Sequence, residues 1–123
     1  MGKLESYRDL EVWKVSMRLA MAVYQATEVM PKNEIYGLTS QIRRACVSVP
    51  ANIAEGYGRN YRKEYLQFLS IANGSLKELE TLLLLAHSLN YVDDITELMN
   101  LCESTGRLLN RLRQSLQRGI DNH

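Results

Sequence analysis

The sequence is poor in residues that interrupt helices and in those that most often carry catalysis. Its 123 residues include only two prolines, seven glycines, two cysteines and two histidines. Because proline and glycine are the least favourable residues inside a helix, their scarcity favours long helices. Cys46 and Cys102 form no C-x-x-C motif and fall at apolar helical positions, so we expect two reduced thiols in a core.

The two histidines offer little to a metal or catalytic centre. His87 falls in the third of four helical patterns, and His123 is the last residue. Di-iron bundles place Glu-x-x-His motifs on facing helices, and the sequence contains no such motif. Neither a zinc site nor a nucleophile with a positioned base is supported. We therefore expect a non-enzymatic protein without metal or cofactor, with His87 at an ordinary helix position.

A strong charge of either sign is also absent. The net charge is +1, so no global field attracts nucleic acid or a membrane, and any such binding must be local. The longest apolar run, residues 82–86, is far shorter than the ~20 residues that span a bilayer. The first seven residues lack the apolar segment of a secretion signal. We expect a cytoplasmic protein without membrane contact.

Apolar periodicity is what the sequence does contain. Hydrophobic residues make up 46% and charged residues 24%, which is typical of a globular chain, and the length predicts a single domain over residues 1–123. Four stretches have the spacing of amphipathic helices, at about residues 9–30, 36–57, 61–89 and 94–118. Short connections force neighbouring helices to run antiparallel, which predicts an all-α, up-down-up-down four-helix bundle.

The first helical pattern carries two apolar series. One has the spacing of a bundle seam and consists of Leu10, Trp13, Met17, Ala20 and Tyr24. The other lies on a different side of the same helix and consists of Val12, Val15, Leu19, Ala22 or Val23, and Ala26. A monomeric bundle covers only one such face well, so we expect the second series to contact another protein. The alternative is that a small protein tolerates scattered exposed apolar side chains.

The middle two patterns each make a specific structural prediction. Pro50 lies inside the second, where it removes a hydrogen bond and clashes with the preceding turn, so we expect a kink or break near residues 46–48. In the third, eight residues follow heptad a/d spacing and predict its buried seam. They are Tyr65, Phe68, Ala72, Ser75, Leu79, Leu82, Ala86 and Leu89.

Four short motifs resemble a known family. They are LEVW at residues 10–13, YGLTSQIRRA at 36–45, SVPANIAEG at 48–56 and IANGSLKELE at 71–80. Together they resemble the bacterial four-helix-bundle proteins that include those encoded in intervening sequences of 23S ribosomal RNA genes. The resemblance implies a four-helix bundle that assembles into a ring-like homopentamer without an established enzymatic activity.

Polar residues in the second and third patterns are candidates for a structural role. Asn52, Glu55, Glu78 and Glu80 are expected to form an ion-pair and hydrogen-bond network, with Arg43 and Arg44 as counter-ions. Such a network fixes helix register or a subunit interface, because a carboxylate near a bundle interior must be paired. Asn52 is expected to satisfy backbone groups exposed by Pro50.

A local cluster of cations and aromatic rings gives the clearest partner signal. Residues 43–63 contain five basic residues and a single acid. Cations bind phosphate and rings stack under bases, so this mixture is typical of RNA or single-stranded DNA binding. The candidate residues are Arg43, Arg44, Tyr57, Arg59, Tyr61, Arg62 and Lys63. Two alternatives remain open: the arginines only solvate a helix end, or the chain is a structural or adaptor oligomer that binds a protein through an exposed helical face.

Overall fold

The computed structural model describes residues 4–122 as four helices joined by short connections. Met1 to Lys3 and His123 lie outside the described residues. The helices are α1 (Glu11–Ala26), α2 (Leu38–Tyr57), α3 (Arg62–Ser88) and α4 (Thr96–Asp121), with short 3₁₀ turns at Tyr7–Asp9, Thr27–Val29 and Lys32–Glu34. The predicted all-α four-helix bundle is confirmed. None of these helices is both long enough and apolar enough to cross a membrane.

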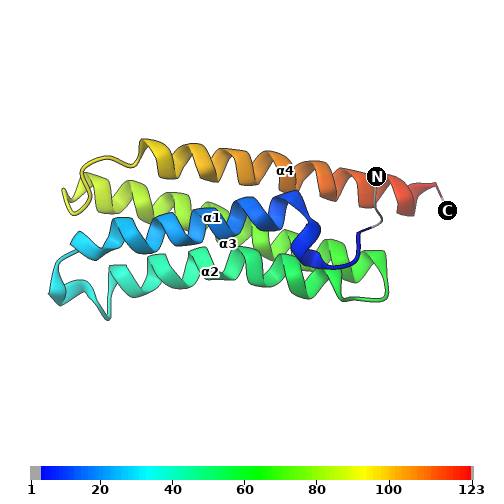
Figure 1. Cartoon of the computed structure of the whole chain (residues 1–123), viewed down its shortest axis with the longest axis horizontal. Coiled ribbons are helices and arrows are strands. Elements are labelled where there is room, and N and C mark those ends of the chain that lie inside the picture. The colour runs from blue at the N-terminus through cyan, green and yellow to red at the C-terminus, as the bar shows by residue number, and fades with distance from the viewer. Residues whose placement is uncertain (1–3, 123) are drawn as a thin grey trace.

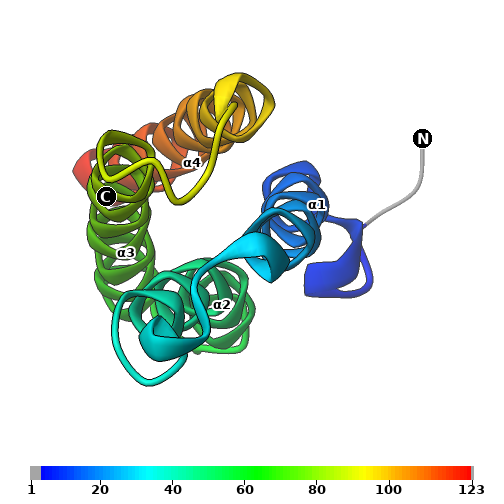
Figure 2. The ribbon, with the colours of Figure 1, turned by 90° about the vertical axis from the view of Figure 1, so that its left-hand side faces the viewer.

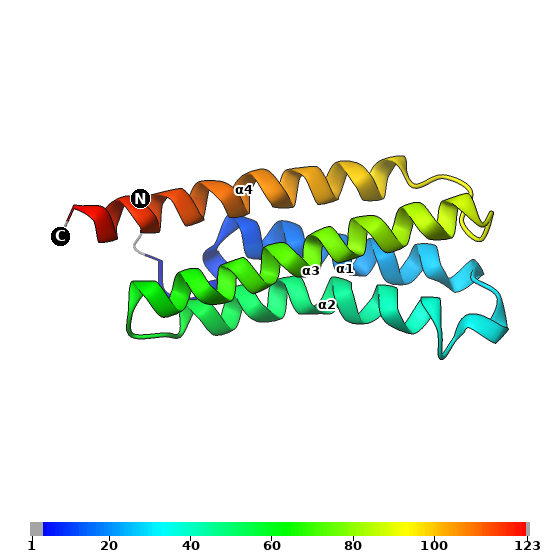
Figure 3. The ribbon, with the colours of Figure 1, turned by 180° about the vertical axis from the view of Figure 1, so that it is seen from behind.

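The helices form a closed four-cornered bundle. Each packs against two others, in the cyclic order α1, α2, α3, α4 and back to α1, as the end view in Figure 2 shows. The chain direction alternates between consecutive helices in Figures 1 and 3. A hydrogen bond from the Tyr91 hydroxyl to Glu34 Oε2 (3.3 Å) ties the α3–α4 connection to the α1–α2 connection. Both connections therefore lie at the same end of the bundle.

Two helix boundaries differ from the sequence prediction for local reasons. The first α-helix ends at Ala26, where the Thr27 hydroxyl donates to the Val23 carbonyl (2.8 Å) and a 3₁₀ turn follows. At the other boundary, Asn90 follows α3 with φ of 61°, a left-handed conformation that asparagine tolerates. The Tyr91 amide then donates to the Ala86 carbonyl (2.9 Å), which closes the helix end.

The burial of the two apolar series of α1 differs from the expectation. Val12, Val15, Leu19 and Val23 of the second series are buried in the core, so the prediction that this series contacts another protein is wrong. The first series is divided: Leu10 and Ala20 are buried, Trp13 is half-buried, and Met17 and Tyr24 are exposed. The surplus apolar surface on α1 is therefore real, but it lies on the other side.

Three of the eight residues predicted for the buried seam of α3 are buried. The buried residues are Leu69, Ala72, Leu76, Leu79, Leu83 and Ala86. The predicted Tyr65 is partly buried and Leu89 is exposed. The predicted Phe68, Ser75 and Leu82 are also only partly buried, and each has a fully buried neighbour one position later. Since α3 packs between α2 and α4, its core face is turned toward both helices. The three displaced positions lie on the side that meets α2 alone.

The second helix is not broken at Pro50. It runs without interruption from Leu38 to Tyr57, with Pro50 buried inside it. Proline costs the helix one backbone hydrogen bond, and the fully buried Val49 and Ile53 beside it anchor both halves in the core. Ser48 therefore lies inside a continuous helix. A bend of the axis at this point remains a prediction.

The α2 backbone approaches α3 closely at Gly56. A Cβ atom built on Gly56 would lie 2.8 Å from Phe68 Cβ and 3.0 Å from Tyr65 Cδ1. Real side chains do not approach so closely, so only glycine fits here without moving α3. Gly106 in α4 is different, because its Cβ would meet only Leu76 Cδ2 at an ordinary 3.5 Å.

These two glycines give a matched test of helix packing. We expect Gly56→Ala to lower the free energy of unfolding by about 1–3 kcal/mol, the usual cost of overpacking a core. Gly106→Ala is expected to raise it by about 0.5–1 kcal/mol, because alanine is the better helix former. Urea denaturation at one protein concentration checks both. Equal effects of the two substitutions would contradict the close approach.

Candidate functional site

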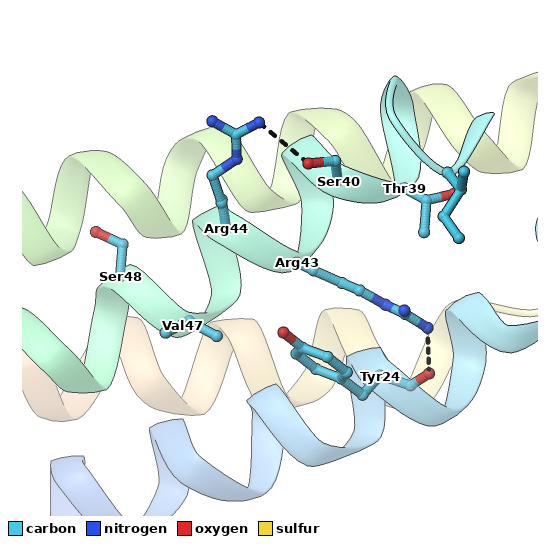
Figure 4. Close-up of a pocket in the computed structure, with 8 residues that line it drawn as sticks. Tyr24, Thr39, Ser40, Arg43, Arg44, Val47 and Ser48 are labelled. Carbon is cyan, nitrogen blue, oxygen red and sulfur yellow. Dashed lines mark hydrogen bonds between the residues drawn. The ribbon is translucent and has the colours of Figure 1, made fainter.

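A groove along the outer edge between α1 and α2 is one of several concave surfaces on the bundle. Its volume is about 500 Å³, and Figure 4 shows the side chains that line it. They are Tyr24, Ile35, Thr39, Ser40, Arg43, Arg44, Val47 and Ser48. We call this surface the α1–α2 groove. Its walls are largely apolar, and its charged lining residues are both arginines.

Arg43 is held in one orientation across the groove. Its Nε donates to Thr27 Oγ1 (3.0 Å) and its Nη2 to the Tyr24 carbonyl (3.3 Å). The guanidinium carbon also lies 4.7 Å from the centre of the Tyr24 ring, a cation–π contact. Figure 4 shows the side chain reaching from α2 to α1. The guanidinium has five N–H donors, so further donors remain for a group that enters the groove.

Thr39 adds an unpartnered hydroxyl to the same groove. The residue is 5% exposed, and its Oγ1 has no hydrogen-bond partner among residues 4–122. A buried hydroxyl without a partner costs about 1–3 kcal/mol. The α1–α2 groove therefore contains one buried hydroxyl that forms no hydrogen bond within the described residues.

Arg44 lines both the α1–α2 groove and a second groove. Its Nη2 donates to Ser40 Oγ (3.1 Å), and the side chain is exposed. The second groove runs between α2 and α3 and has a volume of about 430 Å³. Arg44 and Glu78 both line it, yet no ion pair joins them in the described part of the chain.

The four predicted network residues fall into separate local groups. Asn52 Nδ2 donates to the Ser48 carbonyl (2.8 Å) and to Ser48 Oγ (2.9 Å), while the Ser48 and Ser75 hydroxyls share a hydrogen bond (2.8 Å). Asn52 thus donates to the Ser48 carbonyl and not to the Cys46 carbonyl, which Pro50 leaves without its helical partner, so the expected role of Asn52 is not what the structure shows. It joins a polar link between α2 and α3, for which two small polar residues in adjacent helical patterns were the only signal in the sequence.

The three glutamates take no part in that link. Glu55 pairs with Arg59 (3.1 Å) and Glu80 with Lys77 (3.1 Å), each within one turn of its own helix. Glu78 is exposed at the α2–α3 groove. Exposed pairs of this kind contribute only about 0.3–0.5 kcal/mol each.

The predicted basic and aromatic residues occupy two distant places. Arg43 and Arg44 line the α1–α2 groove, whereas Arg59 lies beyond the end of α2 at Tyr57. Since a helix rises 1.5 Å per residue, the fourteen steps from Arg43 to Tyr57 alone separate the two places by about 21 Å. The structure therefore does not bring all seven residues together.

The residues near the α2–α3 connection do form one cluster. Tyr61 is 69% exposed, and Arg62 and Lys63 beside it are exposed too. Arg59 lies over the Phe68 ring at 4.5 Å from its centre. Tyr57 instead packs edge-on against Tyr65, with ring centres 6.2 Å apart, so it is partly buried and less available to a base.

The interior contains few titratable groups, and burial favours the protonated form of its two thiols. Burial raises the pKa of the Cys46 thiol to about 11 and that of Cys102 to about 12. Both cysteines are free and buried, as predicted. His87 Nδ1 contacts the Val92 carbonyl (3.1 Å) at the end of α3. Among residues 4–122 no three histidine, cysteine, aspartate or glutamate side chains cluster as metal ligands.

Exposed apolar side chains form a face in and beside the α1–α2 groove. Tyr24, Ile35 and Val47 line the groove, and Met17 and Met21 continue the stripe of Tyr24 along α1 at helical spacing. Sequence reasoning missed Ile35 and Val47, because neither falls in a regular apolar series. Their contribution appears only when α1 and α2 are placed side by side.

Comparison with known proteins identifies the family. Residues 8–111 match the family described as 23S rRNA-intervening sequence protein. The chain belongs to this family. Its description refers to the position of a gene and names no activity. No curated protein sequence matches the chain.

A solved structure of a relative has a similar fold. It is a protein of unknown function from the S23 ribosomal protein family of Bacteroides thetaiotaomicron. The two share 22% sequence identity with a TM-score of 0.62 over 85% of this chain and 94% of the other. At this identity the likeness extends to the fold alone.

The buried thiols make a prediction about reactivity and pH. We expect Cys46 and Cys102 to react slowly with Ellman's reagent at pH 8 in the native protein and rapidly in denaturant. Because the folded state raises both pKa values above the ordinary 9.0, it disfavours the thiolates, so stability is expected to fall as the pH rises above about 9. Rapid reaction of the native protein at pH 8 would show that the thiols are accessible.

Proposed function

We propose that this protein is a non-enzymatic building block that assembles into a homo-oligomer through the apolar face around the α1–α2 groove. The observation that carries the proposal is the exposed set Met17, Met21, Tyr24, Ile35 and Val47, which spans two helices and their connection. Contiguous apolar patches of this kind are typical of protein interfaces. Methionine and tyrosine are also enriched at interface centres.

The interior supports an assembly role over catalysis. Its titratable groups are two protonated thiols, and its hydrogen-bonded side chains stabilise helix packing. The family resemblance favours a pentamer. In a ring of identical copies, one face of each copy meets a different face of the next.

Introducing charge into the apolar face tests the proposal. We expect the wild-type protein to be oligomeric at micromolar concentration by light scattering. The double variant Met17→Glu and Met21→Glu is expected to be monomeric with an unchanged helical circular dichroism spectrum, because burying two unpaired carboxylates opposes association.

The double variant Gln114→Glu and Ser115→Glu provides the control, since it places two carboxylates at exposed positions on α4, outside the groove. It is expected to leave the mass unchanged. A monomeric wild-type protein would overturn the proposal and favour the adaptor alternative, in which a different protein occupies the face.

Nucleic-acid binding is the second candidate function. It is supported by Tyr61, Arg62 and Lys63, which are exposed together, and by the fact that the ion pairs of the described residues leave Arg62 and Lys63 unused. Exposed rings beside free cations suit a single strand. In an oligomer this cluster is repeated on every copy, so weak sites add through avidity.

Salt-dependent binding tests this second function. We expect single-stranded RNA or DNA to bind at low salt and to bind less as salt rises, because counter-ions are released. Changing Arg59, Arg62 and Lys63 to Ala is expected to weaken binding in a filter assay by about tenfold or more.

The control removes three cations elsewhere, at Lys14, Lys32 and Lys77, all of which are exposed. If both triple variants lose affinity equally, the cluster has no special role. Absence of binding by the wild-type protein at low salt ends this candidate.

A further inference from the structure

The outer surface of α3 carries an exposed stripe with the spacing of a helix seam. Ile71, Gly74, Glu78, Thr81 and Leu85 follow one another at alternating intervals of three and four residues. All five are exposed, and Ile71 and Leu85 are 48% and 46% exposed. Glu78 therefore lies midway along the stripe, two helical turns from Ile71 on one side and two turns from Leu85 on the other. We call it the α3 stripe.

Gly74 has no packing role inside its own chain. A Cβ atom built there would find nothing within 4 Å. Glycine weakens a helix relative to alanine, so its presence in the middle of a long helix needs another reason. The absence of a side chain at Gly74 lets the backbone of a second helix approach the α3 stripe closely.

The α1–α2 groove complements this stripe in charge. Its lining contains Arg43 and Arg44 and no acid, set among exposed apolar side chains. Two copies that met groove to groove would bring four arginines together, and like charges across an interface are strongly unfavourable. The groove is thus suited to a surface that carries a carboxylate between apolar side chains, which describes the α3 stripe.

We propose that the α3 stripe of one copy docks on the α1–α2 groove of the next copy, with Glu78 pairing with Arg44 across the interface. This rests on the proposed homo-oligomer and names its two contacting surfaces. Arg44 is the available partner because, among residues 4–122, its side chain hydrogen-bonds to Ser40 alone, whereas the Arg43 side chain bonds to Thr27 and Tyr24.

The positions of the two surfaces favour a closed assembly. The groove lies on the α1–α2 side of the bundle, and Glu78 lies on the adjoining α2–α3 side. Neighbouring sides of a four-helix bundle face directions that differ by about a right angle. A repeated contact between such sides turns at each copy and closes a ring of few members, whereas opposite sides would extend a filament.

Charge reversal tests the pair. We expect Arg44→Glu and Glu78→Arg each to weaken assembly ~10-fold or more in sedimentation velocity, since each places like charges opposite one another. Both residues are exposed, so the helical circular dichroism spectrum is expected to stay unchanged. The double variant R44E/E78R is expected to assemble again. Glu103→Arg is the control, because Glu103 is an exposed α4 residue that pairs only with Arg107 of its own helix.

Mixing the two single variants shows whether the pair lies between chains. Arg44 and Glu78 of one chain line the same α2–α3 groove, so a pair within the chain is the competing explanation. If the pair lies between chains, a mixture of R44E and E78R proteins assembles although neither does so alone, and native mass spectrometry finds both variants in one complex. Recovery in the double variant without recovery in the mixture would place the pair within one chain and overturn this inference.

The remaining outcomes separate this inference from the proposed function. An oligomeric wild-type protein whose single variants assemble normally overturns the docking of the α3 stripe but leaves the homo-oligomer intact. A monomeric wild-type protein overturns both.

Discussion

The close contact between α2 and α3 is the constraint on which the rest of the structure depends. Gly56 lets the α2 backbone approach Phe68 and Tyr65, and the Ser48–Ser75 hydrogen bond fixes the register of the two helices about two turns away. Small side chains at both points allow this approach, and the partly buried serine pair is satisfied only in one register. The remaining helices, α1 and α4, then complete the four-helix bundle.

This contact also decides what α2 presents to solvent. One side of α2 faces the core through Ile42, Val49 and Ile53, and another faces α3. The remaining side carries Arg43, Arg44 and Val47 outward along the edge with α1. Because the ion pairs among the described residues are all between near neighbours on one helix, charge contributes little to the fold and remains available at the surface.

The distribution of unsatisfied groups is consistent with function at surfaces. The interior is apolar, and its cysteines stay protonated because burial raises their pKa. The unpartnered hydroxyl of Thr39 lies at the α1–α2 groove, where the spare donors of Arg43 also lie. Buried polar groups are normally satisfied, so the Thr39 hydroxyl is an exception within the described residues.

Periodicity in the sequence by itself determined the number of helices, their approximate limits and the all-α bundle, because the apolar spacing of a helix is a local property. Buried, unreactive cysteines followed from the same pattern. Only the tertiary structure decided which apolar series of α1 is core, that Pro50 leaves α2 continuous, and that Arg43 lies far from Arg59. It also placed Ile35 and Val47 on one face with Met17. A repeat along one helix defines stripes but not their neighbours, and burial depends on which helices lie beside each stripe.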